Sequence, residues 1–229
     1  MPRQARLDFP GTLHHVILRG IEKREIVSDD KDRNDFVGRM GGLAEKTSTS
    51  VYAWALMTNH AHILLRSGLG GISDYMRKLL TGYALFYNRR HNRHVYLFQN
   101  RYKSIVCEEE SYLLELVRYI HLNPLRGGLV YRIGELDGYQ YSGHSVIMGR
   151  IKHKWQDREY VLCLFGGKDG NAKKEYRKFV EAGVEQGHKP ELVGGGLIRS
   201  QGGWSQVISK RRHGKAERSD QRILGSGEF

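Results

Sequence analysis

The sequence lacks the features that mark secreted, disulfide-bonded and membrane-embedded proteins. Only two of its 229 residues are cysteines, Cys107 and Cys163, and they have neither metal-binding spacing nor a disulfide framework. No apolar run approaches the roughly 20 residues of a membrane-spanning helix, and the N-terminus has no hydrophobic signal region. We therefore expect an intracellular, cytoplasmic protein with no membrane partner.

Acidic residues are also scarce. The chain holds 37 Lys and Arg against 25 Asp and Glu, a net charge of +12 that favours a polyanionic partner. Between Tyr75 and Cys107 there is no acid at all. The basic residues that we interpret as DNA-binding candidates in this stretch are Arg77, Lys78, Arg89, Arg90, Arg93, Arg101 and Lys103.

Tyrosines and phenylalanines alternate with these cations. Basic groups that follow phosphates, together with aromatic faces for bases, are what single-stranded nucleic acids require. The alternative is a solvated helix face beside core aromatics, and some of the aromatic residues fit that description. An acid-free stretch of this length favours a nucleic-acid surface.

Hydrophobic periodicity predicts an α+β fold. We expect strands at residues 13–19, 50–56, 60–66 and 96–106, and helices at residues 29–45, 72–91 and 108–123. This order is that of a ferredoxin-like (RRM-like) sandwich with an added helix. The predicted fold class is therefore an antiparallel sheet with helices on one face, followed by a mainly helical and loop C-terminal extension.

Two histidines lie two residues apart in the predicted strand at 60–66. Side chains alternate between the faces of a strand, so His60 and His62 point the same way. Two neutral imidazoles on one face form half of a divalent-metal site, although such a pair also occurs often by chance. His14 and His15 point to opposite faces, so at most one could join the site, and we interpret both as surface or core residues.

A tyrosine and an asparagine occupy the end of the last predicted helix of the domain. Tyr119 and Asn123 are four residues apart and share a helix face, at the edge of an apolar stripe that includes Leu116 and Ile120. Pro124 predicts the end of this helix. The alternatives are a core-edge tyrosine and a C-terminal helix cap.

Three ordered segments carry a resemblance to a known family. His60-Ala61-His62 resembles the His-hydrophobe-His motif of HUH single-strand nucleases, and residues 119–130 resemble the tyrosine helix of the Y1, IS200-like transposases. Residues 97–104 resemble a further family segment. Within the group, the chain is most similar to the REP-associated tyrosine transposases. The similarity covers roughly residues 1–150.

The resemblance implies a metal-dependent transposase that acts on single-stranded or hairpin DNA. It implies Tyr119 as the nucleophile that forms a 5′-phosphotyrosine, and Mg²⁺ or Mn²⁺ held by His60, His62 and Asn123. The insertion-sequence branch of the family has Gln at the Asn123 position, whereas the REP-associated branch uses Asn. The alternatives are a non-catalytic module that binds hairpin DNA or RNA, and a hydrolytic metallonuclease in which Tyr119 is structural.

The composition of the chain changes after about residue 150. We interpret residues 1–150 as the catalytic domain and residues 151–229 as a basic, Gly-rich extension, with a short helix at 201–210 and a truncated DNA-binding region. Related transposases work as homodimers. The extension is long enough to cover the apolar sheet edge that we expect along residues 51–56 and 63–65, so we favour a monomer over a homodimer.

Overall fold

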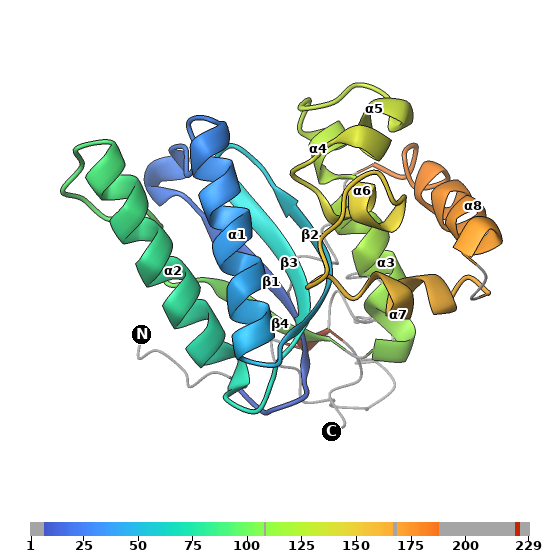
Figure 1. The fold of residues 1–229 in the computed structure, drawn as a ribbon, viewed down its shortest axis with the longest axis horizontal. Helices are drawn as coiled ribbons and strands as arrows, with labels where there is room; N and C mark the ends of the chain where they lie inside the picture. The colour runs from blue at the N-terminus through green and yellow to red at the C-terminus, as the bar shows by residue number, and fades with distance from the viewer. Residues whose placement is uncertain (1–6, 108, 167–168, 188–222, 225–229) are drawn as a thin grey trace, which may run out of the picture.

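A sheet whose four main strands run antiparallel passes through the centre of the molecule (Figure 1). The computed structural model describes residues 7–107, 109–166, 169–187 and 223–224. The strands are β1 (Leu13–Arg19), β2 (Ser50–Leu56), β3 (His60–Arg66), β4 (Lys103–Cys107) and β5 (Ile223–Leu224). The helices are η1 (Ile21–Lys23), α1 (Asp30–Lys46), α2 (Gly71–Arg90), α3 (Glu109–His121), α4 (Asn123–Arg126), α5 (Ile133–Gly138), α6 (Gly143–Ile147), α7 (Arg158–Cys163) and α8 (Asp169–Glu181).

The strand order is β2-β3-β1-β4-β5. The first four strands pair antiparallel, and β5 pairs parallel with β4. The α+β class and the ferredoxin-like element order predicted from the sequence are confirmed. None of the described helices is long and apolar enough to cross a membrane.

The fourth strand is shorter than the sequence predicted. We expected it at residues 96–106, but it begins only at Lys103. Of the preceding residues, Phe98 forms an isolated bridge to Gly20, while Tyr96 is 82% exposed. The polar run Gln99-Asn100-Arg101 separates that bridge from the strand, because its side chains have no apolar face to bury.

Helices cover both faces of the sheet, so the prediction of helices on one face holds only for α1 and α2. Figure 1 shows these two on one side and α3 on the other. The reason lies in the strands, which are apolar on both faces. Ile63 and Leu65 belong to the core beneath α1 and α2, whereas Leu64 belongs to the core beneath α3.

The C-terminal part described here packs into the same core as α3. Leu136, Ile147, Tyr176 and Val180 are fully buried in the cluster that includes Leu116. The hydrophobic core therefore has no break at residue 150. Residues 188–222 and 225–229, with the predicted helix at 201–210 and the Gly-rich stretch, lie outside the described residues.

One edge of the sheet is β2, which pairs with β3 alone among the strands described. This edge is covered by the chain itself. The Leu56 N–H donates to the Tyr141 carbonyl (3.0 Å), and the Asp157 N–H donates to the Val51 carbonyl (2.9 Å). The Trp54 indole N–H donates to Gln156 Oε1 (2.9 Å). Backbone groups that would otherwise be open for pairing with another chain are thus satisfied internally.

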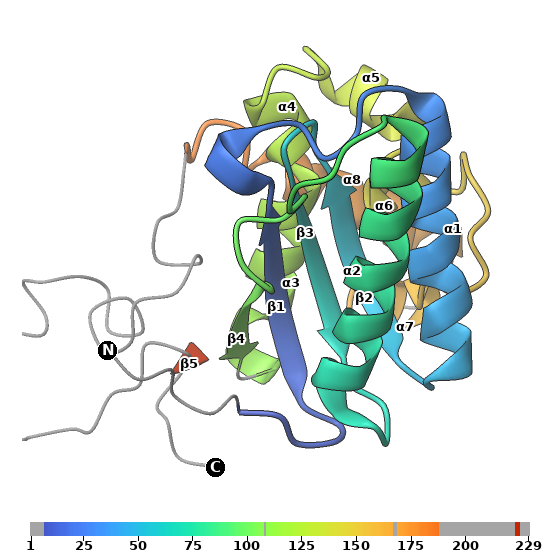
Figure 2. The same ribbon diagram turned by 90° about the vertical axis from the view of Figure 1, so that its left-hand side faces the viewer.

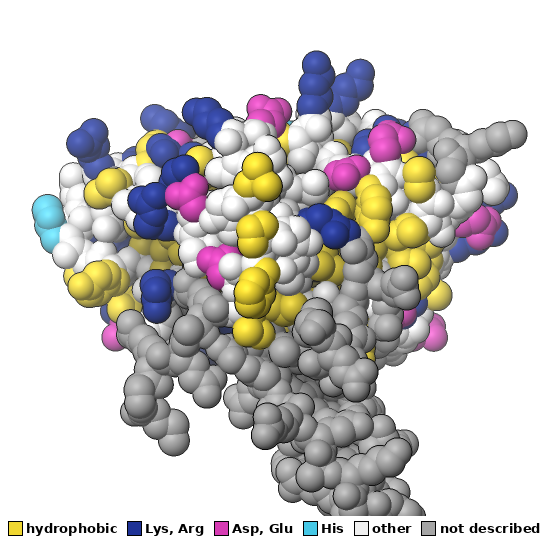
Figure 3. Space-filling model, turned by 90° about the horizontal axis from the view of Figure 1, so that it is seen from below, with side chains coloured by type: hydrophobic (Ala, Val, Ile, Leu, Met, Phe, Trp, Pro, Cys, Tyr) yellow, Lys and Arg dark blue, Asp and Glu magenta, His cyan; other side chains and the backbone are white. Residues whose placement is uncertain are grey.

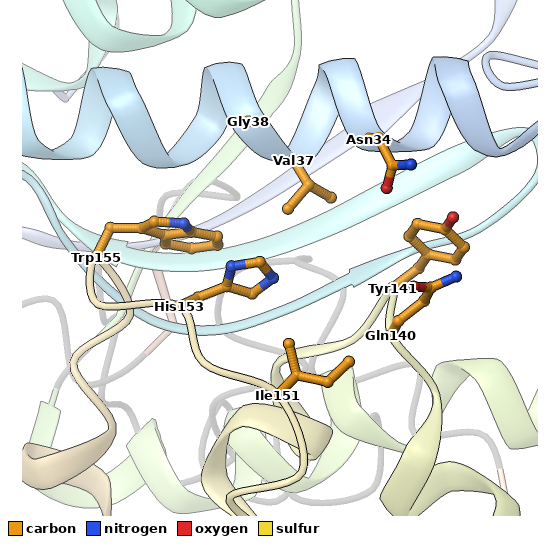
Figure 4. A pocket seen from close by; sticks show the side chains of 8 residues that line it. All are labelled: Asn34, Val37, Gly38, Gln140, Tyr141, Ile151, His153 and Trp155. Carbon is orange, nitrogen blue, oxygen red and sulfur yellow. The ribbon is translucent and has the colours of Figure 1, made fainter.

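A cleft of about 210 Å³ marks the line along which residues 151–155 meet α1 (Figure 4). Trp155 closes one end of it. Its ring lies 5.0 Å from that of His153 and 5.6 Å from that of Trp54. The indole occupies a notch at Gly41, where an added Cβ would lie 2.2 Å from Trp155 Nε1.

Substituting this glycine tests how residues 151–155 dock on α1. Gly41→Ala should destabilise the fold by about 1–3 kcal/mol, because the methyl group displaces Trp155 from its notch. Gly42→Ala is the matched control on the same helix. It has open space around its Cβ and should gain up to about 1 kcal/mol from helix propensity. Urea unfolding measures both, and an equal gain in the two variants would contradict this packing.

Candidate functional site

His60 and His62 lie on the face of β3 that is covered by α3. Their ring centroids are 5.3 Å apart, with the planes nearly perpendicular. His62 is 3% exposed, and His60 is half-buried at the start of the strand. In the antiparallel register, His60 is opposite Arg19 and His62 is opposite Ile17. The alternation predicted from sequence thus places both imidazoles toward the same helix.

Tyr119 faces the histidine pair from α3. Its side chain is 3% exposed and meets the ring of His62 edge-on, with centroids 5.7 Å apart. Leu116, Val117 and Ile120, all fully buried, hold this helix against the sheet. Two segments about sixty residues apart in the sequence therefore bring a phenol and an imidazole together.

Asn123 lies one turn beyond Tyr119. Helix α3 ends at His121 and Asn123 begins α4, but Leu122 between them keeps helical dihedral angles. The Asn123 Nδ2 donates to the carbonyls of Tyr119 (3.1 Å) and Ile120 (3.3 Å). The amide is thereby fixed, and no hydrogen bond among the described residues uses its Oδ1.

Helix α4 runs close to the turn that precedes His60. An added Cβ at Gly127, directly after α4, would lie 2.4 Å from the terminal methyl group of Met57. The chain enters β3 through Thr58 and Asn59 just beyond this contact. The three residues predicted as ligands, His60, His62 and Asn123, therefore come from two segments that approach each other at one end of the sheet.

Hydrogen bonds fix the orientation of both imidazoles. The Nδ1 of His60 donates to Asn59 Oδ1 (2.6 Å), and the Nδ1 of His62 is bonded to the Nε2 of His15 (2.9 Å). In both rings the second nitrogen is Nε2. Burial, aided by Arg19, lowers the pKa of His60 to about 4, so this imidazole is neutral near pH 7 and able to bind a metal.

The donors here suit a divalent cation. Among the described residues there is no cluster of three or more His, Cys, Asp or Glu that could hold a metal ion. Two imidazoles and an amide oxygen are a weaker set, of the kind that leaves coordination positions for water and phosphate oxygens. In metal sites, a ligating imidazole usually donates its other ring N–H to an acceptor, as His60 does to Asn59.

Sequence reasoning missed two residues beside the candidate nucleophile. His15, which we interpreted as a surface or core histidine, also lies edge-on to Tyr119, with ring centroids 6.1 Å apart. Arg126 places its guanidinium carbon 5.6 Å from the centre of the Tyr119 ring. The only sequence signal for His15 was its position two residues before Ile17, which places both side chains on the face of β1 toward α3. This position indicates a site residue only once β1 is known to pair with β3.

Four of the seven predicted DNA-binding residues line one large groove. This groove, of about 1720 Å³, lies between α2 and residues 92–102. Its basic residues from the predicted set are Arg77, Arg89, Arg93 and Arg101, and its aromatic residues are Phe86, Tyr96, Phe98 and Tyr102. Figure 3 shows basic and hydrophobic side chains intermixed on the described surface seen from below.

Arg90 has a structural role instead. Its guanidinium bonds the carboxylates of Asp29 and Asp32 and ties the start of α1 to the end of α2. Arg77 and Lys78 pair with Asp74, although both remain largely exposed. The stretch without acids in sequence is therefore not without acids in space. Arg90, Lys78 and Lys103 do not line the groove.

The groove leads toward the histidine end of the sheet. Figure 2 shows the chain after α2 crossing from the top of that helix toward β4. In this crossing the Ile21 N–H donates to the Leu97 carbonyl (3.0 Å), and the Gly20 N–H donates to the Asn59 carbonyl (2.9 Å). Asn59 directly precedes His60. The groove lies beside α2 and the histidines face α3, so a DNA strand in the groove would pass round this end of the sheet to reach them.

Comparison with known proteins agrees with this geometry. The family model described as transposase IS200 like matches residues 10–123, a span that contains all the candidate site residues except Arg126. The chain belongs to the IS200-like transposase family. The family is one of enzymes that act on DNA.

A solved structure has the same fold. It is a REP-associated tyrosine transposase bound to a REP hairpin, which is 14% identical to this chain with a TM-score of 0.52. The match covers 68% of this chain and 91% of the other. At this identity the likeness extends to the fold alone. No curated protein matches the chain significantly.

The groove predicts a salt-dependent DNA interaction. Arg89→Glu should weaken binding of single-stranded and hairpin DNA for many sequences alike, and should lower the slope of log affinity against log salt by about 1. Arg132→Glu is the control, because Arg132 is exposed, pairs with Glu135 (2.9 Å) and does not line the groove. Fluorescence anisotropy across a salt series measures both. An effect confined to one sequence would count against an electrostatic groove.

Proposed function

We propose that this chain is a metal-dependent transposase that cuts and rejoins single-stranded DNA, including hairpin ends, through Tyr119. The observation that carries the proposal is the contact of Tyr119 with His62, at 5.7 Å between ring centroids, in a site where both Nδ1 atoms of the histidine pair are engaged. DNA binding alone would require neither a buried phenol nor oriented imidazoles. Their combination supports chemistry at a phosphate.

Each residue has a defined role in the proposed reaction. Nε2 of His60, Nε2 of His62 and Oδ1 of Asn123 would hold Mg²⁺ or Mn²⁺, which supplies Lewis-acid polarisation of the scissile phosphate. The Tyr119 hydroxyl gives up its proton as its oxygen attacks phosphorus, the bond from phosphorus to the 3′ oxygen breaks, and the 3′ oxygen takes up a proton and leaves as a 3′-OH. Tyr119 retains the 5′ phosphate. Attack by a 3′-OH reverses these bond changes and frees the phenol.

A covalent intermediate suits transposition better than hydrolysis. A phosphotyrosine conserves the energy of the phosphodiester for rejoining, whereas attack by water does not. Burial of Tyr119 between α3 and the imidazoles restricts where a water could stand. A hydrolytic nuclease with a structural Tyr119 is the main enzymatic alternative, and a non-catalytic hairpin-binding module is the other. Neither alternative produces a covalent protein–DNA species.

Replacing either histidine tests the metal site. His60→Ala and His62→Ala should each weaken Mn²⁺ binding by at least about tenfold and abolish the covalent protein–DNA species, because each removes one of three ligands. Isothermal titration with Mn²⁺ and denaturing electrophoresis with labelled hairpin DNA measure the two effects. His94→Ala, which changes an exposed histidine away from the site, is the control for the metal titration. Normal metal binding and cleavage in both site variants would refute the assignment.

We also propose that the protein acts as a monomer. In other members of the family, two chains share sites, and an open sheet edge is one route to such pairing. Here the β2 edge is occupied by Tyr141, Ser142, Gln156 and Asp157. Light scattering of the full chain should give a monomer mass at low micromolar concentration. A stable dimer under these conditions would show that another surface pairs.

A further inference from the structure

Arg126 is a half-buried cation that lies directly beside the proposed nucleophile. Its guanidinium carbon is 5.6 Å from the centre of the Tyr119 ring. Its Nη2 donates to the Gly183 carbonyl (3.1 Å), which ties α4 to the chain after α8. Its Nε and Nη1 are buried and make no hydrogen bond. Among the described residues no carboxylate forms an ion pair with it.

A neighbouring arginine shows how unusual this is. Arg118, the residue directly before Tyr119, is buried, and both oxygens of Glu115 accept from its Nη2 at 2.5 and 2.6 Å. Its guanidinium also covers the ring of Phe179 at 4.3 Å. Arg126 is half-buried, with its Nε and Nη1 atoms buried, and has no such counterion among the described residues. Burial and the charge of Arg118 lower its pKa, while Tyr119 opposes that change.

Buried N–H donors of a charged group that make no hydrogen bond are costly, and proteins keep such groups where a ligand supplies the missing partner. The position of Arg126 limits what that ligand is. A guanidinium offers a planar set of N–H donors that matches the oxygens of a phosphate. The one anion that the proposed reaction brings to Tyr119 is a phosphodiester.

We propose that Arg126 binds the non-bridging oxygens of the phosphate that is transferred to Tyr119. This inference rests on the proposed function. Phosphorus bonded to the Tyr119 oxygen stands at the edge of the ring whose face Arg126 contacts. A small rotation of the guanidinium exchanges the ring contact for charge-assisted hydrogen bonds from Nε and Nη1. Arg126 thus neutralises the phosphate from α4, while the histidine pair lies on the sheet.

The test compares a charged and a neutral phosphate at the cleavage site. The substrate is the hairpin oligonucleotide that the wild-type protein cleaves, synthesised with either a phosphate or a methylphosphonate at the mapped position. On phosphate, Arg126→Ala should slow single-turnover formation of the covalent species by about 10²-fold or more. On methylphosphonate, which carries no charge, the ratio of wild-type to variant rates should fall to near one. Arg126→Lys should restore part of the rate on phosphate.

A purely structural role gives a different pattern. If Arg126 only links α4 to Gly183, then Arg126→Ala slows both substrates by the same factor, and that result overturns the inference. Arg132→Ala is the control and should leave both rates unchanged.

Failure of the proposed function itself is recognised separately, because then the wild-type protein forms no covalent species on any oligonucleotide. In that case sulfate serves as the probe. It should raise the melting temperature of the wild-type protein and of Arg132→Ala but not of Arg126→Ala. An equal rise in all three would also overturn the role of Arg126.

Discussion

The packing of α3 against the second face of the sheet is the interaction on which the site depends. Leu116, Val117 and Ile120 are fully buried there against a sheet that supplies Ile17 and Leu64. At about 2 kcal/mol for each buried aliphatic side chain, this contact holds the helix in one position. Tyr119 lies on the same helix one residue before Ile120, so the burial of the apolar stripe sets where the phenol meets His62. The geometry of the proposed site is a consequence of core packing.

The second requirement is that the imidazoles present the correct nitrogens. Asn59, in the turn before β3, and His15, on β1, engage Nδ1 of His60 and His62, so these two neighbours determine which nitrogen would face a bound metal. The Asn123 amide is fixed in a similar way by two helix carbonyls. Because each proposed ligand is held by a partner from its own or an adjacent segment, the site needs little rearrangement before a cation binds.

The sequence predicts much of this arrangement, and the parts that it misses share one cause. Strict alternation placed His60 and His62 on one face, and helical spacing placed Tyr119 and Asn123 together. These are local patterns. The role of His15 depends on the register between β1 and β3. Arg90 looked like a free cation because its partners, Asp29 and Asp32, lie about sixty residues away in the chain. Proximity that arises only from tertiary packing has no local signal.

The central claim is that Tyr119 forms a covalent bond with DNA, and mapping that bond tests it most directly. The full chain is incubated with labelled hairpin DNA and Mn²⁺, resolved under denaturing conditions, and digested for mass spectrometry. We expect a single modified peptide that carries the 5′ phosphate on Tyr119. We expect Tyr119→Phe to bind the same DNA with nearly unchanged affinity and to form no covalent species. Modification of another residue, or cleavage without any covalent species, would contradict the account.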